Sequence, residues 1–169
     1  MTRFFSRGLA ALVLGLLPLL AGCLYGFAGG GLPPHVRTVA VLPMENETSS
    51  PELPRELQDA LRLGLHARLG LRDAPEERAN AIVRGTITRY DLDMAAGYSA
   101  NPNQATSARR RLRVYVNIEI VDQVTGKVLW TRTGIQADGE YADRGEALGR
   151  KQAIDRIVTD VIEGAQSQW

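Results

Sequence analysis

The sequence predicts an α+β fold in which two helices pack on one face of a four-stranded mixed sheet, in the order β-α-β-β-β-α. Two observations support this prediction. Four segments are rich in β-branched residues or alternate between polar and apolar side chains, and two others place apolar side chains at helical spacing. A helical crossover after the first strand favours a parallel partner, whereas the later strands are expected to meander antiparallel.

The first strand and the first helix follow each other closely. Residues 36–42 read VRTVAVL and end before Pro43. Their near-continuous apolar run is typical of a strand that is buried on both faces. Residues 49–71 are expected to contain a helix of about five turns, because leucine recurs at every fourth position. These leucines are Leu53, Leu57, Leu61, Leu65 and Leu69.

Three further strands are expected. The second covers residues 80–92, and residues 93–108 lack either periodicity and are expected to form a long loop. Residues 111–122 alternate strictly between apolar and polar side chains, and a QVTG turn leads into a fourth strand at residues 127–139. The apolar side of the third strand comprises Leu112, Val114, Val116, Ile118 and Ile120.

The last segment, residues 140–169, is expected to be helical. Its apolar stripe comprises Ala147, Ile154, Ile157, Val158, Val161 and Ile162. Both helices and the apolar side of the third strand are then expected to share one core. The other sheet face, which carries Arg, Tyr, Asn and Glu, is either solvated or a docking surface for a partner.

The N-terminus is typical of a secreted lipoprotein. Residues 1–22 combine a basic start with an apolar run at residues 8–20, which spans only about 20 Å as a helix and is too short to cross a bilayer. The following LAGC resembles a lipobox, with cleavage between Gly22 and Cys23 and covalent lipid on Cys23. Leu24, which is not an aspartate, favours sorting to the outer membrane.

These features divide the chain into a signal peptide at residues 1–22, a lipidated cysteine with a flexible tether at residues 23–35, and a single α/β sandwich domain at residues 36–169. Cys23 is the only cysteine, so no disulfide is expected. Without residues 1–22 the chain has 18 basic and 19 acidic residues, a net charge of −1 that does not favour nucleic acid as a partner.

The sequence shows no catalytic constellation, so an enzyme is not expected. His35 and His66 have no second histidine and no nearby cysteine at ligand spacing, and neither a metal nor a cofactor is expected apart from the lipid on Cys23. The carboxylates of Glu45 and Glu47 could serve acid–base chemistry, but a solvated loop between strand and helix explains them better.

The strongest concentration of charge is ARRRLR at residues 108–113. On an extended strand Arg109, Arg111 and Arg113 point to the same side, about 7 Å apart in succession. Such a ladder could meet several phosphate groups through charge-assisted hydrogen bonds. Charges that merely keep an exposed sheet face soluble are the alternative.

Several motifs together resemble the lipopolysaccharide-assembly lipoprotein family, the LptE-like proteins. The matching positions are Tyr25, Phe27, Leu32, Pro33, His35, Val36, Arg37, Thr38, Val39, Asn46 and Thr48. The segments RGTITRYDL (84–92) and VDQVTGKVLW (121–130) and the final amphipathic helix are also similar to that family. A family member would carry a glycine after the cysteine, where this chain has Leu24.

The resemblance implies a non-enzymatic lipoprotein of the outer membrane that faces the periplasm. In that family the lipoprotein is the plug and assembly partner of a large β-barrel translocon, and it binds lipopolysaccharide. On this interpretation Arg109, Arg111 and Arg113 become candidates for contact with lipopolysaccharide phosphates or with the barrel wall. No family motif covers these arginines, so their role is a separate hypothesis.

A second resemblance remains open. TVAVLPMENET (38–48) and TGKVLW (125–130) are also similar to periplasmic lipoproteins related to curli-secretion pore subunits and to activators of cell-wall synthases. That alternative implies a regulator or pore subunit without lipopolysaccharide contact. The Leu-Pro-x-His motif so close to Cys23 and the short chain favour the translocon.

Overall fold

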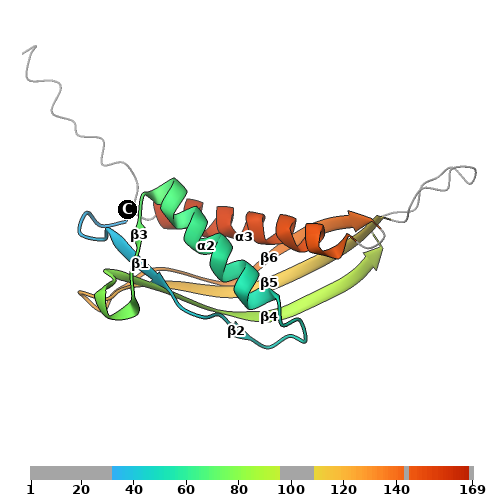
Figure 1. Cartoon of the computed structure of the whole chain (residues 1–169), viewed down its shortest axis with the longest axis horizontal. Helices are drawn as coiled ribbons and strands as arrows, with labels where there is room; N and C mark the ends of the chain where they lie inside the picture. Colours follow the sequence, from blue (N-terminus) through green and yellow to red (C-terminus); the bar gives the residue numbers. More distant parts are fainter. Residues whose placement is uncertain (1–31, 96–108, 143–144, 168–169) are drawn as a thin grey trace, which may run out of the picture.

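The computed structural model describes residues 32–95, 109–142 and 145–167 (Figure 1). The elements are β1 (Thr38–Val41), β2 (Glu45–Asn46), α2 (Leu53–Leu69), β3 (Arg72–Asp73), the 3₁₀ helix η2 (Glu76–Arg78), β4 (Ala81–Ala95), β5 (Arg109–Asp122), β6 (Val128–Ala142) and α3 (Glu146–Ser167). Both helices lie on the same face of one mixed sheet, and no described helix covers the other face (Figure 1).

The sheet has six strands, so the expectation of four is wrong in number. The strand order is β3-β1-β4-β5-β6, and β2 also pairs with β4. The four expected strands are β1, β4, β5 and β6; β1 is parallel to β4, and β4, β5 and β6 form an antiparallel meander, as predicted. The two additional strands have only two residues each, which is too short for any periodic signal.

The short strand β2 continues the path of β1 along the same partner. Pro43 lacks an amide hydrogen and follows the end of β1, so the ladder is interrupted there. The chain then pairs with β4 again, with Glu45 opposite Thr86. The strand β3 similarly follows the end of α2 and pairs parallel to β1.

Helix α2 forms as the leucine spacing predicts. Leu53, Leu57, Leu61 and Leu65 are fully buried. The helix ends at Gly70, whose φ of 66° suits a residue without a side chain and whose N–H donates to the carbonyl of His66. A single buried stripe therefore holds α2 on the sheet.

Helix α3 begins later than predicted. The expected helical segment starts at residue 140, but residues 140–142 still belong to β6 and α3 starts at Glu146. The prediction that Ala147 belongs to the apolar stripe is wrong: Ala147 is exposed, because the first turn of α3 directs Gly149 and Arg150 toward the interior instead. The rest of the predicted stripe, from Ile154 to Ile162, is buried.

Glycines on both elements bring α3 directly onto β6. A Cβ atom added at Gly139 would lie 1.8 Å from the carbonyl oxygen of Gly149, so the backbone of α3 leaves no room for a side chain at residue 139. Gly164 plays the same part near the C-terminal end of α3, where an added Cβ would meet the indole of Trp130. This close approach seals the β6 side of the core.

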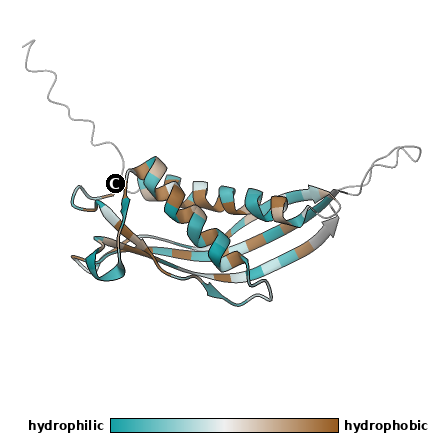
Figure 2. Ribbon diagram, viewed as in Figure 1, coloured by the Kyte–Doolittle hydropathy of each residue, from teal (hydrophilic) through white to brown (hydrophobic). Residues whose placement is uncertain are grey.

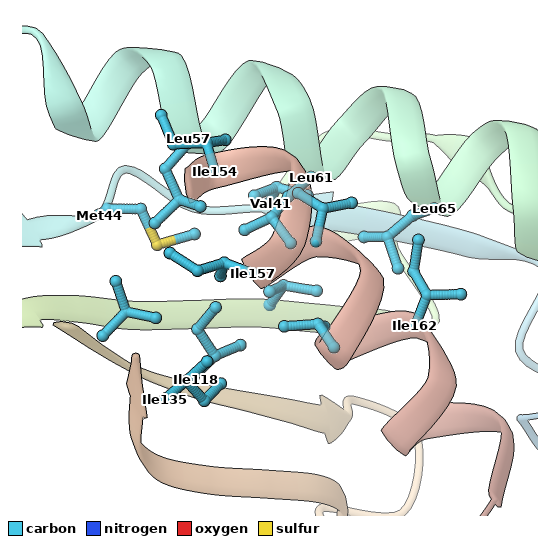
Figure 3. Close-up of a cluster of buried hydrophobic side chains, with 14 of the residues drawn as sticks. Val41, Met44, Leu57, Leu61, Leu65, Ile118, Ile135, Ile154, Ile157 and Ile162 are labelled. Atoms are coloured by element: carbon cyan, nitrogen blue, oxygen red, sulfur yellow. The ribbon is translucent and has the colours of Figure 1, made fainter. Parts of the chain in front are cut away.

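One hydrophobic core lies between the helices and the sheet. Figure 3 shows Leu57, Leu61 and Leu65 of α2 meeting Ile154 and Ile157 of α3 above the strands. Hydrophobic and hydrophilic residues alternate along β4, β5 and β6 in Figure 2, as expected of strands with one buried face.

An ion-pair network around the buried Arg150 closes the core at one end. The guanidinium of Arg150, which is 8% exposed, donates two hydrogen bonds of 3.0 Å to Glu56 of α2 and one of 3.0 Å to Glu146. The hydroxyl of Tyr90 on β4 donates to the same Glu146 carboxylate at 2.8 Å. Burial and this carboxylate raise the pKa of Tyr90 well above its usual range, so the phenol stays protonated and the network ties α2, α3 and β4 together.

Candidate functional site: the open face and the tether junction

The polar face of the sheet lies opposite the two helices, and we call it the open face. It consists of the alternate side chains of β4, β5 and β6 whose neighbours in sequence point into the core. Its members are Arg84, Thr86, Arg89, Asp91, Arg111, Arg113, Tyr115, Asn117, Glu119, Gln136, Asp138 and Glu140.

Cross-strand pairs organise the β4–β5 part of the open face. Arg84 donates from Nε to Glu119 at 2.7 Å, and these two residues are direct neighbours in the antiparallel register. The guanidinium of Arg89 lies 4.0 Å from the centroid of the Tyr115 ring, which is cation–π geometry, and its Nη2 lies 3.0 Å from Asp91. Each basic side chain here has an acidic or aromatic partner.

The same balance holds on the β5–β6 part. Arg113 makes a two-pronged contact with Asp138, in which Nη2 donates to Oδ2 at 2.9 Å. This guanidinium holds the pKa of Asp138 below its usual value, although burial acts in the opposite direction. Arg111 lies 3.8 Å from Asp138 and 3.6 Å from Glu140. An anion that approaches Arg113 must therefore compete with a carboxylate already in place.

The structure places the predicted arginines as follows. Arg111 and Arg113 lie on the same face, as the alternation predicts, and the backbone of Arg109 belongs to β5. The side chain of Arg109 lies outside the described residues, as do Gly22 and Cys23.

Sequence reasoning missed the acidic partners of the ladder. Counting outward from the QVTG turn without interruption pairs Arg113 with Gln136, whereas the structure pairs it with Asp138. Two register shifts, near Val121 and near Ile118, move the partner strand by two residues. The sequence QADGE (136–140) shows two acidic residues at alternate positions, which is a signal for partners of the arginines. The register that sets these acids opposite the arginines cannot be predicted from the sequence.

A polar hollow lies where the open face meets the β1–β2 connection. It measures about 550 Å³, and its walls come from Leu42 and Pro43 on one side and from Arg84, Asn117 and Glu119 on the other. The Thr86 hydroxyl donates to Glu45 at 3.0 Å along its edge. The hollow thus presents carboxylate, amide, hydroxyl and guanidinium groups, which suit hydrogen bonding to polar partners. Within residues 32–95, 109–142 and 145–167, no group of three or more His, Cys, Asp or Glu side chains is arranged to hold a metal ion.

The second site, which we call the tether junction, joins the start of the domain to the β5–β6 turn. His35 Nε2 lies 2.8 Å from Oδ2 of Asp122, a carboxylate that is 1% exposed. The other contacts of Asp122 are with the turn that follows it: it accepts the Thr125 hydroxyl at 2.7 Å and the Val124 N–H at 2.9 Å. Burial alone would raise the pKa of Asp122, but these hydrogen bonds outweigh burial and lower the pKa to about 2.

Asn80 completes the tether junction. Its side-chain oxygen accepts the N–H groups of Arg37 and Thr38, each at 3.1 Å, and its carbonyl accepts the N–H of Gln123 at 2.8 Å. Segments from the start of the domain, from the start of β4 and from the β5–β6 turn are thus held at one end of the sheet.

Among the described residues, no helix is both long enough and apolar enough to span a bilayer.

The described residues define a class of fold: an α+β arrangement in which two helices cover one face of a mixed sheet and the polar face lies opposite. Within this class, residues 36–163, from before β1 to near the end of α3, match the family described as "LptE: Lipopolysaccharide-assembly". The chain therefore belongs to the LptE family and is a cell-envelope lipoprotein of lipopolysaccharide assembly, associated with the outer membrane.

Solved structures share the fold at low sequence identity. Protein XCC0632 from Xanthomonas campestris has a TM-score of 0.58 and 12% identity, covering 81% of this chain and 87% of that one. A PelC dodecamer from Paraburkholderia phytofirmans has a TM-score of 0.51 and 17% identity, covering 80% and 93%. The hypothetical protein CT253 from Chlamydia trachomatis has a TM-score of 0.50 and 13% identity, covering 77% and 98%. Comparison with curated protein sequences gives no match.

The tether junction predicts a specific pH dependence of stability. Because the pKa of Asp122 is about 2 in the folded chain and 3.8 when unfolded, its contribution to stability is complete above about pH 5 and is lost as the pH falls toward 2. Asp122→Asn should lower the free energy of unfolding by about 1–3 kcal/mol at pH 7, and the gap to the wild type should narrow between pH 4 and pH 2. Urea unfolding at several pH values measures both quantities. A gap that stays constant over this range would contradict the assignment.

Proposed function

We propose that this lipoprotein, anchored by a lipid on Cys23 after cleavage behind Gly22, is the non-enzymatic plug and assembly partner of a large outer-membrane β-barrel in lipopolysaccharide assembly. The domain, residues 36–169, then faces the periplasm, with residues 23–35 as its tether. The observation that carries this proposal is the match of residues 36–163 to the lipopolysaccharide-assembly family.

The open face suits a partner with a polar wall. Its arginines and its carboxylates are paired with each other, so a docking partner meets a surface of hydrogen-bond donors and acceptors rather than a field of one sign. A barrel lumen that alternates polar side chains along each strand offers complementary groups. The opposite face of the sheet, in contrast, is covered by α2 and α3 and forms the hydrophobic core.

We further propose that Arg109, Arg111 and Arg113 contact the phosphates of lipopolysaccharide or the barrel wall. Arginine forks bind phosphate in a two-pronged manner. Arg111 supports this role best, because its carboxylate contacts of 3.6 and 3.8 Å are longer than those of Arg113 and leave its donors more available. A phosphate at Arg113 would displace or share the hydrogen bonds to Asp138.

Co-purification tests the proposed function. A tag placed after Trp169 in the full chain, with native outer membranes solubilised in mild detergent, should retain one large β-barrel protein at stoichiometric yield. The matched variant Cys23→Ser blocks lipid attachment, and the protein should then leave the membrane fraction. Recovery of a cell-wall synthase, a ring of identical subunits, or no barrel would contradict the plug role and favour the alternative lipoprotein class.

Substitution of the arginine ladder tests its role in binding. The triple variant Arg109→Gln, Arg111→Gln and Arg113→Gln should bind lipopolysaccharide at least about tenfold more weakly, since charge-assisted hydrogen bonds are lost, with unchanged circular dichroism. The control Arg132→Gln removes an exposed arginine that pairs with Asp160 on α3 and should bind normally.

Removing a charge from the ladder also changes the net charge, and a second variant separates the two effects. Arg113→Gln combined with Asp138→Asn removes both partners of one pair and leaves the net charge unchanged. We expect it to bind more weakly than the wild type, because the guanidinium donors are gone. Wild-type affinity in both this variant and the triple variant would remove the ladder from the binding site.

A further inference from the structure

The β5–β6 turn, residues 123–127, and Val128 at the start of β6 present apolar side chains to the surroundings. Val124 is 68% exposed and Val128 is 49% exposed, and Lys127 between them is exposed as well. Nothing in the turn requires valine at residue 124, because the hydrogen bond from this residue to Asp122 is donated by its backbone N–H. A polar residue would satisfy the same geometry and would not expose apolar surface to water.

The turn is held rigidly in this conformation. The buried carboxylate of Asp122 accepts hydrogen bonds from the N–H of Val124 and from the hydroxyl of Thr125, and Gly126 adopts a φ of 70°. The N–H of Gln123 is fixed by the carbonyl of Asn80. Val124 therefore stays outward without the ordering cost that a loose loop would pay on binding.

The position of the turn brings it near the lipid anchor. His35 contacts the same Asp122 that organises the turn, so the chain enters the domain beside it. The nine residues 23–31 between the lipidated cysteine and the first described residue span at most about 30 Å. A membrane that holds the lipid of Cys23 thus lies within reach of the turn.

We propose that the β5–β6 turn rests on the membrane leaflet that holds the lipid anchor, with Val124 and Val128 at the boundary of the acyl chains and Lys127 at the lipid phosphates. This inference depends on lipidation of Cys23, which is part of the proposed function. Apolar tips beside a cation match the chemistry of an anionic lipid surface. A short tether makes even a weak contact effective, because it keeps the local concentration of the surface high.

The contact would also orient the domain. Arg113 lies nine residues before Asp122 along β5, which corresponds to about 30 Å of strand. If the turn lies at the membrane surface, the arginine ladder lies away from the membrane, near the other end of β5. The membrane contact and the ladder thus lie at opposite ends of the same hairpin (Figure 1).

A spin label measures the contact directly. Cys23 is the only native cysteine, and its thiol is blocked by lipid in the mature protein, so Val124→Cys provides a single free thiol for a nitroxide. The labelled lipoprotein is reconstituted in vesicles of phosphatidylethanolamine and phosphatidylglycerol. Oxygen concentrates in lipid, whereas a nickel chelate stays in water. The accessibility of the nitroxide at residue 124 to oxygen is therefore compared with its accessibility to the nickel chelate.

The matched control is Leu148→Cys, a residue of α3 that is 59% exposed and lies at the other end of the domain. We expect the oxygen-to-nickel ratio at residue 124 to exceed that at residue 148 at least about threefold, as for a side chain at the headgroup boundary. Adding Lys127→Glu should reduce the ratio at residue 124. Equal ratios at the two residues, or contact seen only in native membranes that contain the barrel, would overturn the inference.

Flotation of the vesicles separates this inference from the proposed function. If the protein floats with the vesicles but the nitroxide at residue 124 is accessible mainly to the nickel chelate, only the membrane contact of the turn is contradicted. A protein that does not float contradicts the lipid anchor and, with it, both proposals.

Discussion

The side chains of β5 alternate between a face sealed by two helices and a face that no described helix covers, and the rest of the structure depends on this one-sided burial. Five apolar side chains of β5 lie in the core with the leucine stripe of α2 and the isoleucines of α3. The same alternation leaves Arg111, Arg113 and Tyr115 on the other side. The core and the candidate binding surface are therefore consequences of one pattern with period two.

The pairing of charges sets what the open face can bind. A ladder of unpaired arginines would attract any polyanion, but Asp138 and Glu140 on β6 restrain Arg113 and Arg111. On the neighbouring strand, Glu119 of β5 restrains Arg84 of β4 in the same way. Such a surface discriminates by geometry, because a ligand must offer acceptors that replace the existing carboxylates.

The tether junction fixes the start of the domain to the β5–β6 turn through a buried carboxylate. Asp122 joins the chain beside His35 to the turn beyond β5, 87 residues away in sequence. The start of the domain and the β5–β6 turn are thereby held together at one end of the sheet.

The sequence predicts the long elements well and the local pairings poorly. The leucine stripe of α2 and the alternation in β5 extend over many residues, so their periodicity identifies them. The strands β2 and β3 have two residues each and carry no period. The partners of Arg113 depend on two register shifts in the hairpin, and the contact of His35 with Asp122 depends on the tertiary fold, so neither can be read from one chain.

The central claim is that the open face is the surface that docks against a β-barrel. Site-specific photo-crosslinking in intact cells tests it most directly, with the photoreactive residue at Thr86 or Gln136 on the open face and at Leu63 on the exposed side of α2 as the comparison. We predict that the open-face positions give one adduct with a large outer-membrane β-barrel. Adducts from Leu63 together with none from the open face would contradict the claim.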